Sequence, residues 1–425
     1  MRRRDETDGT WFLLYPQAPV LSAFATPQRI RLSSPRGSVD AGPCDDRAYV
    51  VDAIGKAEPY GYPLLPPWRG PRRPPVRPGP AGHFDHLMPG TRDFACAHLF
   101  GSVRHTLDVW ERFFGRPIRW HFARDFPRLE LIPLLDWDNA QSGYGFIETG
   151  WDRARDGTIL QFALSTDTIA HEIGHSILFA EVGVPVAQHR TAAFLAFHEA
   201  FADLIALICA MQFDAVLDHV LVATHGNLYV ENEINRIAEL SRTEQIRVAS
   251  HSLRMDDVAG ITLDAAGDWH DAAGKGRHAH ELGLPLLGAV FDILIEIYEL
   301  ALVELGLIGT ALDRESRSGD YDAARVERVR QGFAAAYAGR HAGFREALEY
   351  ARDYMGFAMA RAIDDLWPDD FGFGRVGAAL LDADREMSGG RYAPFIEESF
   401  RWREIAIPRL PPLRRPFAGL AMELR

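Results

Sequence analysis

Lysine and cysteine are scarce in this sequence. Only two of its 46 basic residues are lysines, Lys56 and Lys275, which indicates a coding bias toward arginine more than a function. The three cysteines, Cys44, Cys96 and Cys209, are too few and too scattered for a disulfide framework or a cysteine zinc cage. Cysteine chemistry is therefore not expected to hold the fold together or to bind a metal.

An excess of positive charge and long apolar runs are missing as well. The formal net charge of −13 argues against a nucleic-acid partner, which needs a basic face. No stretch reaches the roughly 18 apolar residues of a membrane-spanning helix. The first residues, MRRRDETDGTWFLLYP, carry acids and an apolar patch shorter than the roughly 7–15 residues of a secretory signal. We therefore expect a cytoplasmic protein without a membrane partner.

What is present is an ordinary globular composition, 47% apolar and 25% charged, whose pattern changes along the chain. Residues 1–61 hold strand-like runs, and residues 62–83 are rich in proline, glycine and arginine, which favours an extended linker or wrapping arm. Residues 84–205 mix strands with helices, whereas residues 206–425 are mostly helical. This order predicts an α+β architecture. Expected helices span 98–114, the HEIGH segment up to Gly183, 191–213, 285–306, 322–337 and 342–365, with strands in 129–165.

The segment HEIGH, residues 171–175, places two histidines and a glutamate on one expected helix. Because residues i and i+4 lie about 5–6 Å apart on one helix face, His171 and His175 can offer imidazole nitrogens to one ion. Zinc accepts such nitrogens at about 2.0–2.1 Å. Glu172 then points beside the ion, where a base for a water molecule belongs. The alternative is a helix that merely carries polar residues, because the motif arises by chance in roughly a few percent of such chains.

The next expected helix supplies two carboxylates. In FHEAFADL, residues 197–204, Glu199 and Asp203 are four apart and share a face. A catalytic zinc takes three protein ligands, so Glu199 is the candidate third ligand, and Asp203 is placed to accept the other ring N–H of a liganding histidine. The alternative, two solvated helix residues, fits the largely apolar neighbours less well.

HEIGH followed by HEAFAD resembles the gluzincin metallopeptidases, in particular the thermolysin and fungalysin group, whose pattern is HExxH and then ExxxD. The resemblance implies a two-lobed thermolysin-like fold with one zinc ion per chain. It implies these roles: His171, His175 and Glu199 as ligands, Glu172 as general base and Asp203 as the partner of a liganding histidine. The resemblance covers about residues 84–405, and the segment 380–405 is similar to the closing helices of the group.

Two further segments resemble the same group. In LDWDNAQSGYGFIETG, Asn139 and Ala140 match the edge strand that pairs with a peptide substrate; a turn asparagine in a hairpin is the alternative. In RHAHELGLPLLGAVFDIL, a histidine would donate to the oxyanion of the reaction. His280, in H-x-x-G with Gly283, is preferred over His278, and two loop histidines without such a role are the alternative.

The sequence also departs from the group. Residues 176–198 contain no tyrosine to assist the oxyanion, although His189 and Arg190 lie in this connection. A long propeptide and a carboxylate cluster typical of a calcium site are not recognisable. Residues 1–83 either mask the cleft as a built-in inhibitor or pack elsewhere as a permanent layer. The second is expected, because their apolar runs need burial in an active form.

These observations predict a zinc-dependent peptide-bond hydrolase acting on peptides or proteins. A zinc-binding but catalytically inactive module is the main alternative, although such a module has no need of Glu172. A one-site aminopeptidase is disfavoured because no GxMEN-like strand is present to grip a free amine.

Overall fold

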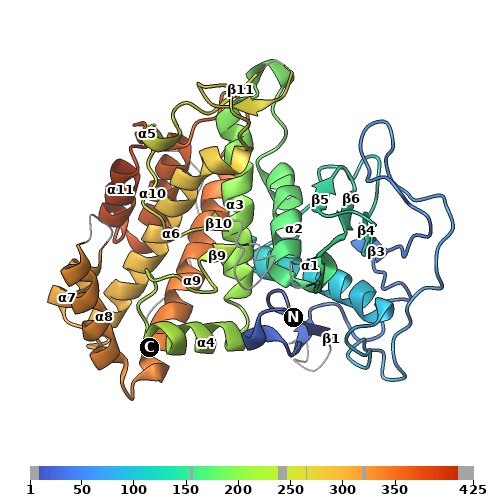
Figure 1. Cartoon of the computed structure of the whole chain (residues 1–425), viewed down its shortest axis with the longest axis horizontal. Helices are drawn as coiled ribbons and strands as arrows, with labels where there is room; N and C mark the ends of the chain where they lie inside the picture. Colours follow the sequence, from blue (N-terminus) through green and yellow to red (C-terminus); the bar gives the residue numbers. More distant parts are fainter. Residues whose placement is uncertain (1–8, 154–156, 238–246, 265, 318–321, 410–425) are drawn as a thin grey trace. The chain divides into compact units, whose positions relative to one another are not determined.

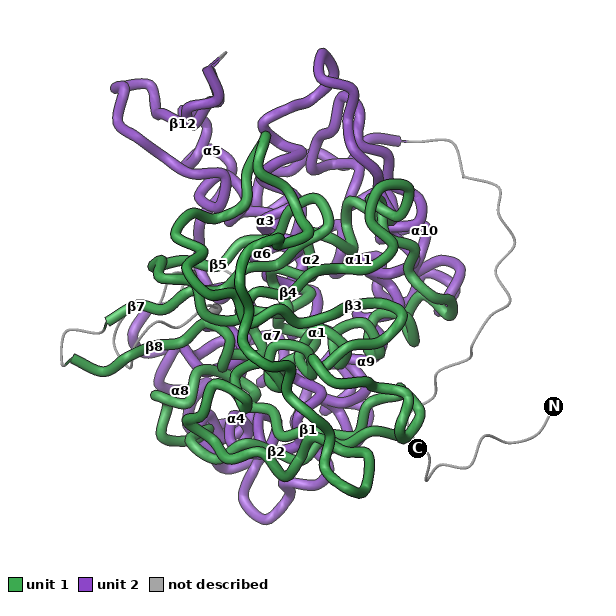
Figure 2. The backbone as a smooth tube through the Cα atoms, turned by 90° about the vertical axis from the view of Figure 1, so that its right-hand side faces the viewer, with its two compact units in different colours: residues 1–180, 205–210, 237–247 green, residues 181–204, 211–236, 248–425 purple. Residues whose placement is uncertain are grey.

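The computed structural model describes residues 9–153, 157–237, 247–264, 266–317 and 322–409. The backbone divides into two compact units, drawn in two colours in Figure 2. Unit 1 comprises residues 1–180, 205–210 and 237–247, and unit 2 comprises residues 181–204, 211–236 and 248–425. The predicted α+β class with a mostly helical C-terminal half is confirmed (Figure 1). The N-terminal 61 residues and the proline-rich segment 62–83 belong to unit 1 in this division.

Unit 1 is built around the long helix α1, Arg92–Phe114. The Thr91 hydroxyl accepts a hydrogen bond from the Phe94 N–H at 3.2 Å, and this cap starts the helix earlier than the predicted residue 98. Gly115 ends it as predicted, in the left-handed conformation with φ of 67°. The hairpin of β1 (Thr10–Leu14) and β2 (Gln28–Leu32) packs against α1.

A four-stranded sheet forms the second part of unit 1, with the strand order β3-β4-β6-β5. The strands are β3 (Ala48–Val50), β4 (Leu129–Ile132), β6 (Phe146–Thr149) and β5 (Ala140–Gly143). The first three strands run parallel, and β5 pairs antiparallel with β6 at one edge. Unit 1 also contains β7 (Trp151–Arg153), β8 (Ile159–Gln161), and the short helices η1 (Ser22–Phe24) and η2 (Phe162–Leu164).

Two buried glutamates in this sheet bind the chain that leads into the proline-rich arm. Glu130 accepts hydrogen bonds from the Tyr60 hydroxyl at 2.6 Å and from the Trp68 N–H at 3.0 Å. Glu148 forms an ion pair of 2.6 Å with Lys56, whose ammonium lies over the Tyr60 ring. Both partners of this ion pair are shielded from solvent. These contacts hold the chain from Lys56 to Trp68 against the sheet of unit 1, whereas most residues of the arm itself are exposed.

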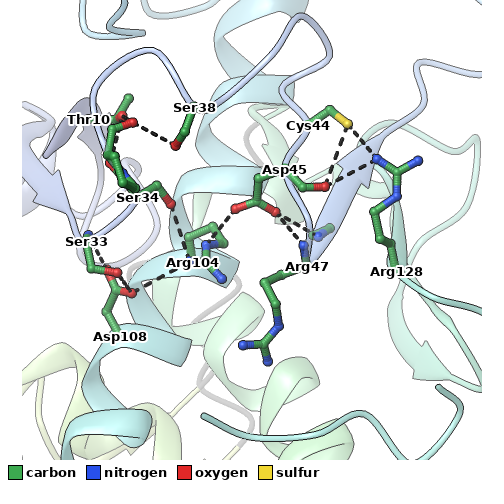
Figure 3. A network of polar contacts seen from close by, with 12 residues as sticks. Thr10, Ser33, Ser34, Ser38, Cys44, Asp45, Arg47, Arg104, Asp108 and Arg128 are labelled. Carbon is green, nitrogen blue, oxygen red and sulfur yellow. Dashed lines mark hydrogen bonds and ion pairs between the residues drawn. The ribbon is translucent and has the colours of Figure 1, made fainter.

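A second polar network fixes the N-terminal segment to α1 (Figure 3). Asp45 forms a buried ion pair with Arg104 at 3.0 Å and accepts the backbone N–H of Arg47 at 2.8 Å. One turn along α1, Asp108 accepts hydrogen bonds from the backbone and the hydroxyl of Ser33. The network joins two loops of the first 50 residues to one helix face.

The helix that carries HEIGH begins at the end of unit 1. It is α2, Thr166–Glu181, and it ends before Gly183, whose φ is 96°. Its first residue, Thr166, donates its N–H to the Tyr15 carbonyl and shares a hydroxyl hydrogen bond of 2.9 Å with Ser102. Tyr15 in turn donates its N–H to His98 at 2.8 Å. The N-terminal segment and α1 therefore fix the start of α2.

Unit 2 is mainly helical. Its long helix α6, Ala279–Glu304, packs against α9 (His341–Asp364) and α11 (Ala393–Trp402), and α9 packs against α10 (Gly374–Ser388). The remaining elements are α4 (Asp214–Thr224), α5 (Met255–Val258), α7 (Thr310–Ser316), α8 (Ala323–Tyr337), η3 (Ala187–His189), β11 (Thr262–Leu263) and β12 (Trp269–His270), with β9 (Arg236–Ile237) and β10 (Arg247–Val248) at the division between the units.

Helix α3, Ala192–Ala210, contributes residues to both units. It is long and apolar enough to cross a membrane, with a mean hydropathy of 1.8 over the tested window. Because 78% of that window is buried inside the protein, the helix has the pattern of a core helix.

Candidate metal centre

The two histidines of HEIGH face each other on α2. Their Nε2 atoms are 3.2 Å apart and the ring planes are nearly perpendicular, at 89°. His171 is buried and His175 is half-buried. Two ligands held at about 2.0–2.1 Å from one tetrahedral zinc are about 3.3 Å apart, so this spacing fits a shared zinc ion.

Glu172 lies between the histidines in sequence and is 8% exposed. The helix buries Ile169, Ile173 and Ile177 completely. Burial of these residues fixes the rotation of the helix about its axis and hence the direction of its polar side chains. Glu172 is therefore a carboxylate to which bulk water has little access.

Glu199 is half-buried on α3, among aromatic neighbours. The ring of His198 packs on Phe194 at 4.7 Å and on Phe197 at 5.8 Å between centroids. Asp203 follows one turn later and is 1% exposed. The sequence-based expectation that these carboxylates sit in a buried helix is thereby met. The hydrogen bond from a liganding histidine to Asp203 stays a prediction.

The donor atoms of His171, His175 and Glu199 all lie within 4.8 Å of one another. Within the described ranges, this is the one group of three or more histidine, cysteine or acidic residues that is compact enough to hold a metal ion. Two imidazole nitrogens and one carboxylate oxygen are a ligand set that zinc accepts. The three residues predicted as ligands are thus brought together.

The two candidate oxyanion donors differ in their surroundings. His280 lies in the first turn of α6, and its Nδ1 is 3.0 Å from Oε2 of Glu199. His278 is the exposed N-cap residue of α6 and makes no side-chain capping hydrogen bond. The helix begins at Ala279, not near 285 as predicted, although Pro285 lies inside it. His280 is therefore a helix residue beside a candidate ligand and not a loop residue.

The predicted substrate strand is an edge strand of unit 1. Ala140 begins β5, at the edge of the four-stranded sheet. The Asn139 side chain accepts the N–H of Ala140 at 2.8 Å, a local bond that suits the turn alternative, while its carbonyl accepts the Gly150 N–H. The hydroxyl of Ser142 in β5 lies 2.9 Å from that of Ser176, the residue after His175. This hydrogen bond places the edge strand beside the HEIGH helix.

Sequence reasoning did not single out Ser176 or Phe179. Phe179 follows His175 by one helical turn, and its ring lies 5.3 Å from that of His121, which also contacts Tyr144 of the β5–β6 turn at 5.4 Å. Burial lowers the pKa of His121 to about 4, so it stays neutral at physiological pH. The position of Phe179, four residues after His175, could have drawn attention to it in the sequence. Its contact with His121 could not be predicted, because the two residues are far apart in the chain.

His189 and Arg190 lie in the connection where the gluzincins carry a tyrosine that assists the oxyanion. His189 ends η3, and its Nδ1 lies 3.1 Å from the exposed carboxylate of Asp370. It is not part of the compact metal-binding group. Arg190 follows as the C-terminal cap residue of η3. A role for either residue at the oxyanion stays untested.

Comparison with known proteins adds no family to this geometry. No family model matches the chain, and no curated protein matches it significantly. The resemblance to the gluzincins therefore depends on the motif residues described above.

Proposed function

We propose that this protein is a zinc-dependent peptide-bond hydrolase of thermolysin-like fold, with one zinc ion held by His171, His175 and Glu199. The observation that carries the proposal is the convergence of these donors within 4.8 Å, together with a buried glutamate, Glu172, directly after His171 in the chain. A metal site used only for structure has no need of a base beside its ligands. Bulk water has little access to Glu172, which suits a base that acts on one bound water molecule.

When bound, zinc supplies Lewis acidity, which polarises a scissile carbonyl and lowers the pKa of a water molecule. Glu172 accepts a proton from the attacking water and passes it to the leaving amine. His171 and His175 keep their Nε2 atoms directed to one point through the rigid spacing of α2. His280 is the candidate donor to the oxyanion, because it lies beside Glu199 whereas His278 is exposed.

The edge strand β5 supports a peptide as the substrate. An edge strand offers unpaired backbone N–H and C=O groups, which an extended peptide can pair with. Ala140 starts this strand, and the hydrogen bond between Ser142 and Ser176 holds it beside the helix that carries the histidines. A peptide added to the edge would run along the HEIGH helix.

The test begins with metal content. Purified protein is expected to contain about one zinc per chain, and Glu199→Ala is expected to lower that content. Glu172→Gln, which keeps the shape but removes the base, is expected to keep zinc and abolish cleavage of a peptide library. Unchanged zinc in Glu199→Ala would sink the ligand assignment.

The second arm separates the enzyme from a binding module. A wild-type protein that holds zinc and cleaves no peptide in a broad library would favour the zinc-binding but inactive module. Equal activity in wild type and Glu172→Gln would remove Glu172 from the mechanism even if peptides are cleaved.

A further inference from the structure

The first turn of α6 approaches α3 unusually closely at Gly283. A Cβ atom on Gly283 would lie 2.5 Å from the carbonyl oxygen of Ala196 and 3.4 Å from the Cβ of Ala200. Contacts below 3.0 Å do not occur between a real Cβ and a backbone atom, so any larger residue pushes the two helices apart. Gly283 is required here for close approach, and its backbone conformation is helical.

This close approach determines which side chains meet one turn away. Moving back three residues on α6 from Gly283 leads to His280, and moving forward three residues on α3 from Ala196 leads to Glu199. Residues three apart lie on the same helix face. The observed 3.0 Å between His280 Nδ1 and Glu199 Oε2 is the consequence of this packing. Both helix segments belong to unit 2.

We infer that His280 is a positioning residue for the metal ligand Glu199, and that Gly283 makes this possible by bringing α6 onto α3. The inference rests on the proposed function, because Glu199 is a ligand only there. Holding Glu199 is a role of His280 in addition to donation to the oxyanion, which does not require this contact. The H-x-x-G spacing then follows from packing, because Gly283 lets α6 approach α3 and His280, on the same helix face, reaches Glu199.

The physical reason is the freedom of a glutamate side chain. A half-buried glutamate has three rotatable bonds, and holding it in one rotamer costs conformational entropy each time a metal binds. A partner that contacts one carboxylate oxygen restricts the side chain beforehand and leaves the other oxygen for the metal. Partners of this kind change metal affinity by about 10–100-fold when they are removed.

The experiment measures zinc affinity by competition with a chromophoric chelator, using the full chain. His280→Ala is expected to weaken zinc binding about 10–100-fold, and His280→Gln, which keeps an N–H donor, is expected to recover part of the loss. His278→Ala is the matched control, since it removes an exposed histidine two residues away, and its zinc affinity is expected to equal that of wild type.

A second variant tests the packing step. Gly283→Ala is expected to weaken zinc binding as well, because α6 must move away from Ala196. The free energy of unfolding of the metal-free protein is measured for each variant. His280→Ala is expected to leave it unchanged, whereas a purely structural histidine would lower it.

The outcomes separate the two proposals. An unchanged zinc dissociation constant in His280→Ala with a lowered kcat overturns the positioning role and leaves the oxyanion role, while the hydrolase proposal stands. A wild-type chain that binds no zinc removes the proposed function and this inference together. Equal losses in His280→Ala and His278→Ala would also overturn the inference, because they show a general effect of the helix end.

Discussion

Asp203 is the residue outside the proposed ligand set that is best placed to support metal binding. It is 1% exposed and lies one turn after Glu199 on α3. A carboxylate in such a position is costly unless a positive or N–H-bearing group accompanies it. In the proposed site, the ring N–H of a liganding histidine would be this partner and would fix the tautomer that binds the metal.

Asp203→Ala is therefore expected to weaken zinc binding by about 10–100-fold, less than the loss of the ligand in Glu199→Ala. The measurement is the zinc dissociation constant of each purified variant at fixed pH. Asp214→Ala is the control, because Asp214 is an exposed carboxylate at the start of α4. Affinity equal to wild type in Asp203→Ala would show that the aspartate serves the fold alone.

Lys56 gives a residue-scale prediction for stability. Its ammonium is buried against Glu148 at 2.6 Å, and removing one partner of a buried pair leaves the other charge without compensation. Lys56→Met is expected to lower the free energy of unfolding by about 3–5 kcal/mol. The measurement is denaturant unfolding, with Lys275→Met as the control, because Lys275 is the other lysine and is exposed.

The double variant Lys56→Met with Glu148→Gln separates charge from packing. It is expected to recover part of the loss, because the uncompensated charge is gone. A loss of less than about 0.5 kcal/mol in Lys56→Met, the usual size for a surface change, would contradict the buried ion pair.

The facing pair of histidines could be predicted from the sequence because helix geometry links spacing to direction. His171 and His175 share a face on any α-helix, so the pair needed no tertiary knowledge. The role of Lys56 could not be predicted, since its partner Glu148 is far away in the chain. The close packing at Gly283 could not be predicted either, because the H-x-x-G spacing does not reveal which backbone the glycine contacts.

At the scale of elements, α6 combines a row of buried acids with few positive partners. Asp292 pairs with the buried Arg403 at 2.8 Å, and Glu296 lies 3.3 Å from the Nε of Arg317. Glu299 accepts a hydrogen bond from the Ser316 hydroxyl at the end of α7. Burial raises the pKa of Glu296 to about 8, against the lowering effect of Arg317.

This shift predicts how stability depends on pH. In the unfolded chain Glu296 ionises near its ordinary pKa of 4.5, whereas in the folded protein it keeps its proton up to about pH 8. The folded state therefore binds more protons between these values, and its stability is lost as the pH rises through this window. The slope from this one group is at most about 1.4 kcal/mol per pH unit.

Glu296→Gln is expected to reduce this slope, because glutamine resembles the protonated carboxyl and does not ionise. The measurement is the free energy of unfolding at several pH values between about 5 and 8, for wild type and variant. Glu304→Gln on the exposed end of the same helix is the control. Parallel curves for wild type and Glu296→Gln would show that Glu296 is ionised in the folded protein.

The boundaries of the elements show which signals in the sequence were sufficient. Gly115 ends α1 where predicted, because a left-handed C-cap favours glycine. The start of α6 was placed too late, because the predicted helix 285–306 followed the apolar run and left out the polar residues before it. The helix instead continues through Pro285 from Ala279, without the backbone hydrogen bond that proline cannot donate.

At the scale of the whole chain, the question is whether residues 1–83 guard the site or support it. In unit 1 they contribute β3 to the sheet and the partners of three buried charges: Asp45 for Arg104, Tyr60 for Glu130 and Lys56 for Glu148. Tyr15 also accepts the N–H of Thr166, the first residue of the HEIGH helix. A removable inhibitor would not be expected to supply interior contacts of this kind.

Deletion of residues 1–83 is therefore expected to give an aggregated or unfolded protein without peptidase activity. The reason is that Arg104, Glu130 and Glu148 would lose partners inside unit 1 while the apolar surface of α1 becomes exposed. The measurements are soluble yield, circular dichroism and peptide cleavage. The matched control is a full-length chain cut at a protease site introduced between the exposed residues Pro80 and Ala81, which keeps the segment but not its covalent link. This nicked form is expected to remain folded and as active as the intact chain. A soluble truncated protein that cleaves peptides faster than the full chain would instead make the segment a propeptide.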